Sequence, residues 1–221
     1  WIRGRLKIDV YFTLRMSFHH FPGEFVYWDQ IKNHEEIKNQ LLPIILQKSK
    51  ENTNNPYEAC NLNTSLIRDK QKAYDENVFL LSENVLKSVI FQNIQKLITQ
   101  YNKVHNSNIN IGPSVVSGCW WNVYGEGDFQ EEHNHIGSPT NLENDVFYPS
   151  FSAIYILHDE NEESSIIFRK DSPLPLKKPF EDYGFSTSNV RDIGEGTIIL
   201  FPSSLKHLVK PCAKPGRVTV A

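Results

Sequence analysis

The sequence predicts an α+β fold that is mainly β, with helices in the N-terminal half and an antiparallel sandwich or barrel in the C-terminal half. Two observations carry this prediction. Apolar residues repeat with helical spacing in two stretches before residue 110. From residue 111 onward, short runs rich in Val, Ile, Phe and Tyr alternate with turns that contain Gly, Pro and Asn. The helices are too closely tied in sequence to the strands to indicate a second domain.

The helical half contains two amphipathic stretches. In residues 29–49 the apolar positions suit a helix that Asp29 would cap and that Pro43 would disturb. Residues 82–101 carry a more regular apolar stripe with a period of 3.6. Residues 18–28 mix aromatic residues with a Pro-Gly turn and indicate an edge strand, and the polar stretch 50–63 indicates a loop.

The C-terminal half predicts a series of short strands. Two longer insertions, 136–150 and 170–189, contain several Pro, Ser and Asn residues and are candidates for loops at the mouth of a site. The expected strands are 115–124, 129–135, 151–158, 165–168, 197–201, 207–210 and 217–221.

Composition narrows the function classes. The chain has 221 residues, of which 39% are hydrophobic and 22% charged, which is ordinary for a globular protein with one sizeable core. The net charge is −3 without an extended basic run, so there is no clear nucleic-acid signal, and no apolar run has the length of a membrane span. Three scattered cysteines without a C-x-x-C motif indicate reduced thiols in an intracellular setting.

The two ends of the chain carry expectations of their own. Met16 is the only methionine, so we expect residues 1–15 to be an upstream extension and residues 16–221 to form a single domain. Within it, 16–110 would give helical support and 111–221 the β core. The chain stops at Ala221, inside an expected strand, so we expect a truncated C-terminus.

The segment from residue 120 to residue 135 carries the first candidate ligands. It predicts a strand, a turn at 125–127, and a second strand that ends in His133-Asn134-His135. Alternate residues of a strand share a face, so Glu131, His133 and His135 are expected on one side. Two imidazoles and a carboxylate suit Fe(II), Mn(II), Ni(II) or Zn(II). Because such pairs also occur on solvated surfaces, this hypothesis needs support from elsewhere in the chain.

Two downstream residues supply that support. An apolar strand stops at Pro202, and a polar turn then leads into His207. Arg217 follows after a connection that contains Pro and Gly. This connection predicts a hairpin, in which the strand that begins at His207 lies beside the strand that carries Arg217. A buried guanidinium near a metal could bind the far carboxylate of a dicarboxylate that chelates the metal. The plainer alternatives are a structural histidine and a surface salt bridge.

As a set, these motifs resemble the 2-oxoglutarate- and Fe(II)-dependent oxygenases, and most closely the small prolyl-hydroxylase-like proteins of bacteria and phages. The resemblance covers residues 111–221 and leaves the helical half without a motif. Its parts are Trp120-Trp121-Asn122 with Tyr124, Gly127-Asp128-Phe129-Gln130, His133-x-His135, Ser152-x-x-Tyr155-x-Leu157, Phe201-Pro202-Ser203 before His207, and Arg217.

The resemblance implies a fold, a chemistry and a set of roles. The fold would be a double-stranded β-helix (jelly roll, cupin-like) with the N-terminal helices packed on one sheet. Fe(II) would be held by His133, His135 and His207. The cosubstrate 2-oxoglutarate would bind Arg217 with help from Tyr124 or Tyr155, ascorbate would support turnover, and a hydroxylated product would form with succinate and CO2. Residues in supporting or substrate-facing positions would be Trp121, Asn122, Gln130 and Glu131, although Trp121 and Asn122 suit a core tryptophan and a hydrogen-bonded asparagine equally well.

One position departs from the wider superfamily, whose usual ligands are His-x-Asp or His-x-Glu plus a distal His. Here His135 stands where the carboxylate is expected. Either the metal has three histidine ligands, or a carboxylate from elsewhere completes the set, with Glu131 the nearest candidate and Asp128 a more remote one.

Three readings of function follow. The first is an oxygenase in a bacterial or host cytoplasm that acts on a prolyl or other protein side chain, a nucleobase or a small metabolite. The second is a cupin-like metal protein that does not use 2-oxoglutarate, and the third is a non-enzymatic jelly-roll module. No pattern in the sequence indicates the oligomeric state.

Overall fold

A computed structural model gives the structure of the chain. It describes residues 17–21, 24–52, 60–66, 76–110, 116, 118–136, 140–142, 145–147, 150–160, 165–169 and 184–221. The expected upstream extension 1–15 and most of the expected loop 170–189 lie outside these ranges. The elements are β1 (Ser17–Phe21), β2 (Glu24–Gln30), α1 (His34–Glu51), β3 (Cys60–Asn61), β4 (Asn63–Thr64), α2 (Glu76–His105), β5 (Trp121–Tyr124), β6 (Phe129–His133), β7 (Thr140–Leu142), β8 (Asp145–Phe147), β9 (Phe151–Asp159), β10 (Ile166–Arg169), β11 (Gly184–Ser186), a 3-10 turn η1 (Thr187–Asn189), β12 (Thr197–Pro202), β13 (Lys206–Val209) and β14 (Arg217–Val220).

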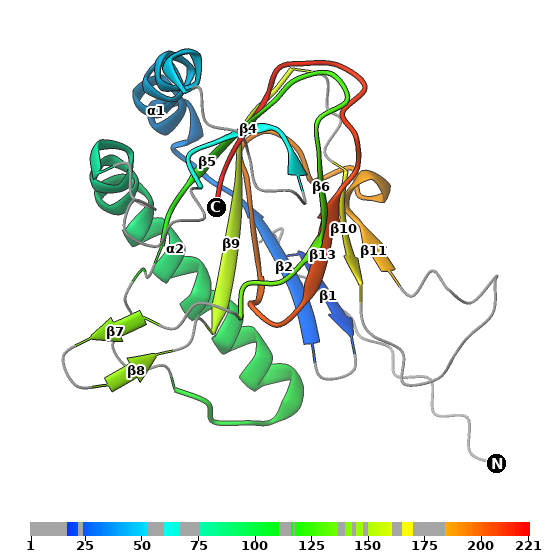
Figure 1. Ribbon diagram of the computed structural model, residues 1–221. Helices are drawn as coiled ribbons and strands as arrows, with labels where there is room; N and C mark the ends of the chain where they lie inside the picture. Colours follow the sequence, from blue (N-terminus) through cyan, green and yellow to red (C-terminus); the bar gives the residue numbers. More distant parts are fainter. Residues whose placement is uncertain are drawn as a thin grey trace.

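Two antiparallel sheets form the centre of the described structure (Figure 1). The larger has the strand order β1-β2-β12-β9-β14-β5-β4, and the smaller has the order β11-β10-β13-β6-β3. Eight of these strands form the central unit: β12-β9-β14-β5 in the larger sheet and β11-β10-β13-β6 in the smaller one. Followed along the chain, they alternate between the two sheets, except that β10 and β11 lie in the same sheet. This winding is that of a double-stranded β-helix, or jelly roll, so the expected fold class is confirmed.

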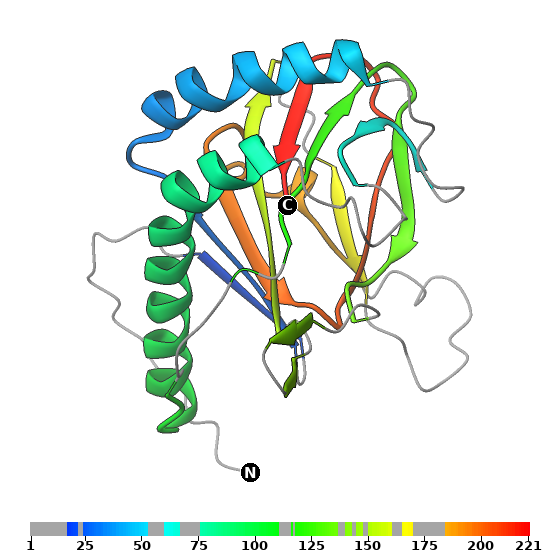
Figure 2. The same ribbon diagram turned by 60° about the vertical axis from the view of Figure 1, so that its left-hand side comes forward.

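Both helices lie on the outer face of the larger sheet (Figure 2). Helix α1 buries Ile37, Leu41 and Ile45 against that face, and α2 buries Ile94 and Leu97. No helix in the described part of the chain is both long and apolar enough to cross a membrane.

The first helix does not begin where its sequence pattern predicts. Asp29 belongs to β2, because its backbone pairs with Ile198 of β12, and the N-cap is Asn33. Pairing with a neighbouring strand has overridden a local capping signal. The helix runs through Pro43, whose missing N–H is offset by the apolar stripe on either side of it. Helix α2 is longer than its regular stripe of 82–101.

The strands follow the expected runs with shorter or shifted ends. In the expected strand 115–124, residues 115 and 117 lie outside the described ranges, and the described residues form a strand over Trp121–Tyr124. The expected hairpin between His207 and Arg217 is wrong, because β13 lies in the smaller sheet and β14 in the larger one. Residues 210–216 therefore cross from one sheet to the other.

Apolar side chains fill the space between the two sheets. Ile154, Ile156 and Phe201, which the sequence places inside the β core, belong to this inner cluster and are 7%, 0% and 0% exposed. Their neighbours along β9, such as Tyr155 and Leu157, face the helices instead. Alternation along each strand of the larger sheet thus separates residues that line the interior from residues that support the helices.

Candidate metal centre

Strand β6 carries a β-bulge that decides which side chains face the interior. His133 pairs with His207, but Gln130 pairs with Val209, so β6 has one residue more than β13 over the same distance. The bulge lets Gln130 and His133 both turn inward, while Glu131 and Glu132 between them are exposed. The expected strand phase of Glu131 with His133 is therefore wrong, since simple alternation does not hold through a bulge.

Two neighbouring strands and a turn bring the three histidines together. His207 lies on β13 directly beside His133 on β6 and is 2% exposed. His135 follows the end of β6, where its backbone N–H donates to the carbonyl of Ser203 at 2.9 Å. One ring nitrogen from each histidine lies within 4.8 Å of the other two.

Hydrogen bonds to the far side of each ring settle which nitrogens meet. Nδ1 of His133 bonds the carbonyl of Glu131 at 2.7 Å, and Nδ1 of His207 bonds the carbonyl of Leu205 at 3.1 Å. A carbonyl can only accept, so both Nδ1 atoms carry hydrogen and both Nε2 atoms present a lone pair. Nδ1 of His135 bonds the hydroxyl of Ser152 at 2.8 Å. All three Nε2 atoms are therefore left for a shared ligand.

Burial keeps these rings neutral. Desolvation lowers the pKa of His133 and lowers that of His207 well below its usual range. It also lowers the pKa of His135 to about 4, helped by the repulsion that His133 would exert if protonated. A neutral imidazole with a free Nε2 is the form that ligates Fe(II), Zn(II) and related ions. The donor set therefore fits a divalent metal.

No carboxylate joins this group among the described residues. The two candidates from the sequence are occupied elsewhere: Glu131 is exposed, and the carboxylate of Asp128 accepts from the backbone N–H of Gly125 at 2.7 Å. The described ligand set is thus three histidines, and a bound dication would keep its full charge of two.

Arg217 is a buried cation that makes no hydrogen bond to an oxygen or nitrogen of the described structure. It opens β14, is 2% exposed, and none of its three guanidinium nitrogens has such a partner in the described structure. Its guanidinium lies 5.0 Å from the centre of the Tyr124 ring, on the neighbouring strand. Burial raises the pKa of the Cys212 thiol, and the charge of Arg217 together with a hydrogen bond from it acts against that rise, so the thiol lies against the guanidinium. A charge buried in this way is costly unless a ligand pairs with it.

The three histidines and Arg217 line the same pocket. Its walls come mainly from strands of both sheets, and the described residues that line it include no acidic side chain. The other lining residues are Trp120, Asn122, Tyr124, Gln130, Ile154, Ile166, Val209, Thr219 and Ala221.

Hydrogen bonds among the lining residues fix the polar wall of this pocket. The Tyr124 hydroxyl donates to Oε1 of Gln130 at 2.9 Å. Asn122 donates to the hydroxyl of Thr219 at 3.2 Å and accepts from Thr64 at 2.8 Å. The candidates Tyr124, Asn122 and Gln130 thus all line the pocket. Tyr124 and Asn122 lie on β5, beside the strand of Arg217, and Gln130 lies on β6 in the smaller sheet.

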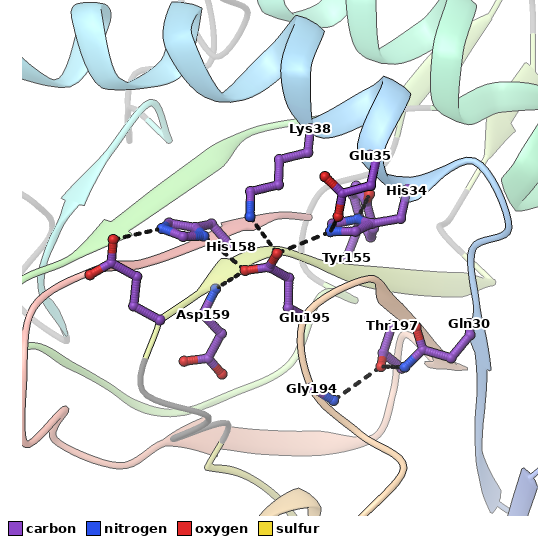
Figure 3. Close-up of polar contacts among 11 residues, drawn as sticks. Gln30, His34, Glu35, Lys38, Tyr155, His158, Asp159, Gly194, Glu195 and Thr197 are labelled. Carbon is purple, nitrogen blue, oxygen red and sulfur yellow. Dashed lines mark hydrogen bonds and ion pairs between the residues drawn. The ribbon is translucent and has the colours of Figure 1, made fainter.

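Two candidate residues from the sequence face the other way. Trp121 and Tyr155 pack with the helices on the outer face of the larger sheet and do not line the pocket. The Tyr155 hydroxyl bonds Nδ1 of His34 on α1 at 2.6 Å (Figure 3). The expected cosubstrate role of Tyr155 is therefore corrected to a structural one, and Trp121 is a core tryptophan.

Tyr155 belongs to a polar cluster around Glu195, in the turn before β12 (Figure 3). Lys38 and His34 of α1 contact Oε1 of Glu195, while His158 and the backbone N–H of Asp159 contact Oε2 at 2.8 and 2.9 Å. Burial acts to raise the pKa of Glu195, but these bonds lower it to about 2. We name these residues the Glu195 cluster; it joins α1 to the larger sheet.

Sequence reasoning assigned no role to Trp120 and Thr219, which line the pocket, or to Ser152, which does not line it but bonds the ring of His135. Trp120 lies before β5, and its ring meets that of His135 edge-on, with centroids 5.4 Å apart. Thr219 shares the inward phase of Arg217 two residues earlier, a signal that was available once Arg217 was placed inside. Ser152 had no such signal, because its role depends on a turn from a different part of the chain.

Comparisons with known proteins give structural neighbours only. No protein-family model matches the sequence, and no curated protein matches it in sequence. The chain is similar in structure to a prolyl-4-hydroxylase of Pseudomonas putida, with 13% identity, 87% of this chain and 89% of that chain covered, and a TM-score of 0.48. It is also similar to the viral collagen prolyl hydroxylase of Paramecium bursaria Chlorella virus-1, solved as a 2OG complex, with 10% identity, 87% and 92% covered, and a TM-score of 0.42.

Proposed function

We propose that this chain is an Fe(II)- and 2-oxoglutarate-dependent oxygenase that hydroxylates a substrate at the mouth of the jelly roll. The resemblance of residues 111–221 to small prolyl-hydroxylase-like proteins makes a prolyl or another protein side chain the first class to test. The proposal places the reaction in the pocket between His133, His135, His207 and Arg217.

The observation that carries this proposal is the unpaired guanidinium of Arg217 in the same pocket as three neutral imidazoles. A dication on the histidines and the guanidinium would give three positive charges, and no acidic residue stands among the described residues of the pocket lining to balance them. A dicarboxylate that bridges the two centres supplies two negative charges at the two places that need them. 2-Oxoglutarate carries two negative charges, with a metal-chelating keto acid at one end and a carboxylate at the other.

The residues of the chain would divide the work as follows. His133, His135 and His207 hold the metal through Nε2. Arg217 binds the C5 carboxylate, and a planar fork of donors favours two parallel hydrogen bonds to it. Tyr124 holds the guanidinium from one side and is itself fixed by Gln130. Asn122 and Thr219 are already hydrogen-bonded to each other and add a rigid polar wall.

When bound, the iron supplies the oxidative decarboxylation of 2-oxoglutarate with O2 to succinate and CO2, and the oxidising power for hydroxylation. The chain itself positions the cosubstrate and keeps water out of the pocket. Ile154 and Ile166 line the pocket, and Phe201 packs its ring 4.8 Å from the His207 ring. Such apolar walls exclude water from the pocket.

The three-histidine set specifically favours one alternative, a cupin-like dioxygenase that does not use 2-oxoglutarate. That protein would have the same metal ligands but no use for a buried, unpaired arginine. Binding of 2-oxoglutarate through Arg217 therefore separates the two functions.

The test is turnover of purified protein with Fe(II), ascorbate and 2-oxoglutarate, followed as succinate release. We expect slow release without a substrate, and none from His207→Ala. Arg217→Ala should weaken 2-oxoglutarate binding about 10- to 100-fold, the range for loss of a charge-assisted hydrogen-bonded pair, and leave metal binding unchanged.

The matched control is Arg169→Ala, which removes an exposed arginine from the outer side of the smaller sheet. It should change neither quantity. Metal binding without any binding of 2-oxoglutarate would support the cupin-like alternative, and equal loss of both ligands in Arg217→Ala would indicate misfolding.

A further inference from the structure

The three histidines differ in what holds the far side of the ring. His133 and His207 each bond a backbone carbonyl, which only accepts. His135 bonds a hydroxyl, that of Ser152, which can accept or donate. The position of the ring hydrogen is therefore fixed in two of the histidines and free to change in the third.

A second serine extends this contact. The hydroxyls of Ser152 and Ser203 lie 2.9 Å apart, and either can be the donor. Ser152 is on β9, and Ser203 follows β12, the strand that pairs with β9 through Phe201 and Ser152. Ser203 is 1% exposed, and its hydroxyl has no other partner in the described structure. Because the carbonyl of Ser203 also accepts the backbone N–H of His135, the three residues form one closed unit.

Counting hydrogens gives this unit two arrangements. In the first, Ser203 donates to Ser152, and Ser152 donates to Nδ1 of His135, so both hydroxyl hydrogens are used and Nε2 carries the ring hydrogen. In the second, Nδ1 of His135 donates to Ser152, Ser152 donates to Ser203, and the Ser203 hydrogen has no acceptor. A buried donor without an acceptor is unfavourable, which favours the first arrangement.

The centre of the site favours the same arrangement when no metal is bound. If all three rings carried hydrogen on Nδ1, three lone pairs would face each other within 4.8 Å with no donor among them. A hydrogen on Nε2 of His135 relieves that repulsion. A metal reverses the balance, because it needs the lone pair of Nε2 and so requires the hydrogen on Nδ1.

We propose that Ser152 and Ser203 form a reversible hydroxyl relay that makes His135 a conditional ligand, whereas His133 and His207 are ligands prepared in advance. This inference rests on the metal centre proposed above and adds Ser152 and Ser203 as its positioning residues. Metal binding moves the ring hydrogen of His135 from Nε2 to Nδ1 and turns both hydroxyls round. Without the relay, the metallated ring of His135 has a buried N–H with no acceptor.

The direct test is the position of the ring hydrogens, read from two-bond ¹H–¹⁵N spectra of protein with labelled histidine, first metal-free and then with the diamagnetic ion Zn(II). We expect hydrogen on Nδ1 of His133 and His207 in both states. His135 should carry hydrogen on Nε2 without metal and on Nδ1 with it. If His135 already carries hydrogen on Nδ1 in the metal-free protein and Zn(II) still binds, the relay is refuted while the metal centre stands. If Zn(II) shifts none of the three rings, both are refuted.

A variant series gives a second readout. Ser152→Ala should weaken Zn(II) binding, measured by competition with a chelator, about 10- to 100-fold, the usual effect of removing the partner of a ligating histidine. Ser152→Thr retains a hydroxyl and should recover most of the affinity. The matched control is Ser188→Ala, which breaks the exposed hydroxyl pair of Ser186 and Ser188 at 2.8 Å and should change nothing. Unchanged Zn(II) affinity in a folded Ser152→Ala protein overturns the relay.

Discussion

Replacing Arg217 with methionine should stabilise the ligand-free protein. The guanidinium is 2% exposed and makes no hydrogen bond to oxygen or nitrogen in the described structure. Folding therefore removes a charge from water at a cost that its neighbours, among them Tyr124 and its buried strand partner Asp159, repay only in part. Methionine has a similar length and fills irregular space without a charge. The variant tests whether the arginine is retained for a ligand and not for the fold.

The magnitude follows from two opposing terms. Desolvation of an ion in a protein interior costs several kcal/mol after relaxation. Contact with the face of Tyr124, at 5.0 Å from the ring centre, returns about 1–2 kcal/mol. We therefore expect the free energy of unfolding of Arg217→Met to exceed that of the parent by about 1–3 kcal/mol, which for a chain of this size raises Tm by roughly 2–12 °C.

The assay is urea unfolding in the presence of a chelator and in the absence of 2-oxoglutarate, with Arg169→Met as the control at an exposed position. Adding metal and 2-oxoglutarate should stabilise the parent and leave Arg217→Met almost unchanged by the 2-oxoglutarate. A clear loss of stability in ligand-free Arg217→Met would refute the reasoning, because it would mean that the fold itself pairs this charge.

Three further predictions test separate parts of the structure. Glu195→Gln should make the free energy of unfolding depend less on pH below pH 4.5. The pKa of the Glu195 carboxyl is lowered from 4.5 to about 2, so its contribution of at most about 3 kcal/mol is complete above pH 4.5 and is lost as the pH falls toward 2. Parallel pH profiles of parent and variant in urea unfolding would contradict this. Tyr155→Phe should lower the free energy of unfolding by about 0.5–1.5 kcal/mol, because it loses the hydrogen bond to His34, and should leave 2-oxoglutarate binding intact. Tyr124→Phe should weaken 2-oxoglutarate binding. The reverse pattern in titrations would mean that the inner and outer faces of the larger sheet are misassigned. His207→Ala should remove bound metal, measured as metal per chain after dialysis, while Cys212→Ala should retain it, and equal metal content in both would contradict the proposed ligand set.

Much of the site follows from the sequence because its chemistry depends on spacing. The sequence shows the His133–His135 pair, an apolar strand that ends shortly before His207, and Arg217 downstream of it. The structure brings these three histidines and the arginine to one pocket. The jelly roll also follows from the succession of short strands and from the resemblance of its motifs.

The remainder depends on facts that a sequence does not contain. Alternation gives the relative phase of residues on a strand but not which phase faces inward. The sequence therefore leaves Trp121 open between the pocket and the core and assigns Tyr155 to the pocket, whereas both pack with the helices. The bulge in β6 breaks alternation altogether and exposes Glu131. Asp29 looks like a helix cap until β12 pairs with it. The contact of Ser152 with Ser203 arises only when two distant strands align.

The central claim is that a metal on three histidines and the guanidinium of Arg217 bind the two ends of one dianion. The most direct measurement is an anaerobic titration of the Fe(II) protein with 2-oxoglutarate and with pyruvate, which has the same chelating end but no distal carboxylate, followed by the visible charge-transfer band of the chelate. The account predicts that 2-oxoglutarate binds at least about 10-fold more tightly than pyruvate, in line with one charge-assisted pair, and that Arg217→Met abolishes this preference. Equal affinity for the two acids in the parent protein would contradict it.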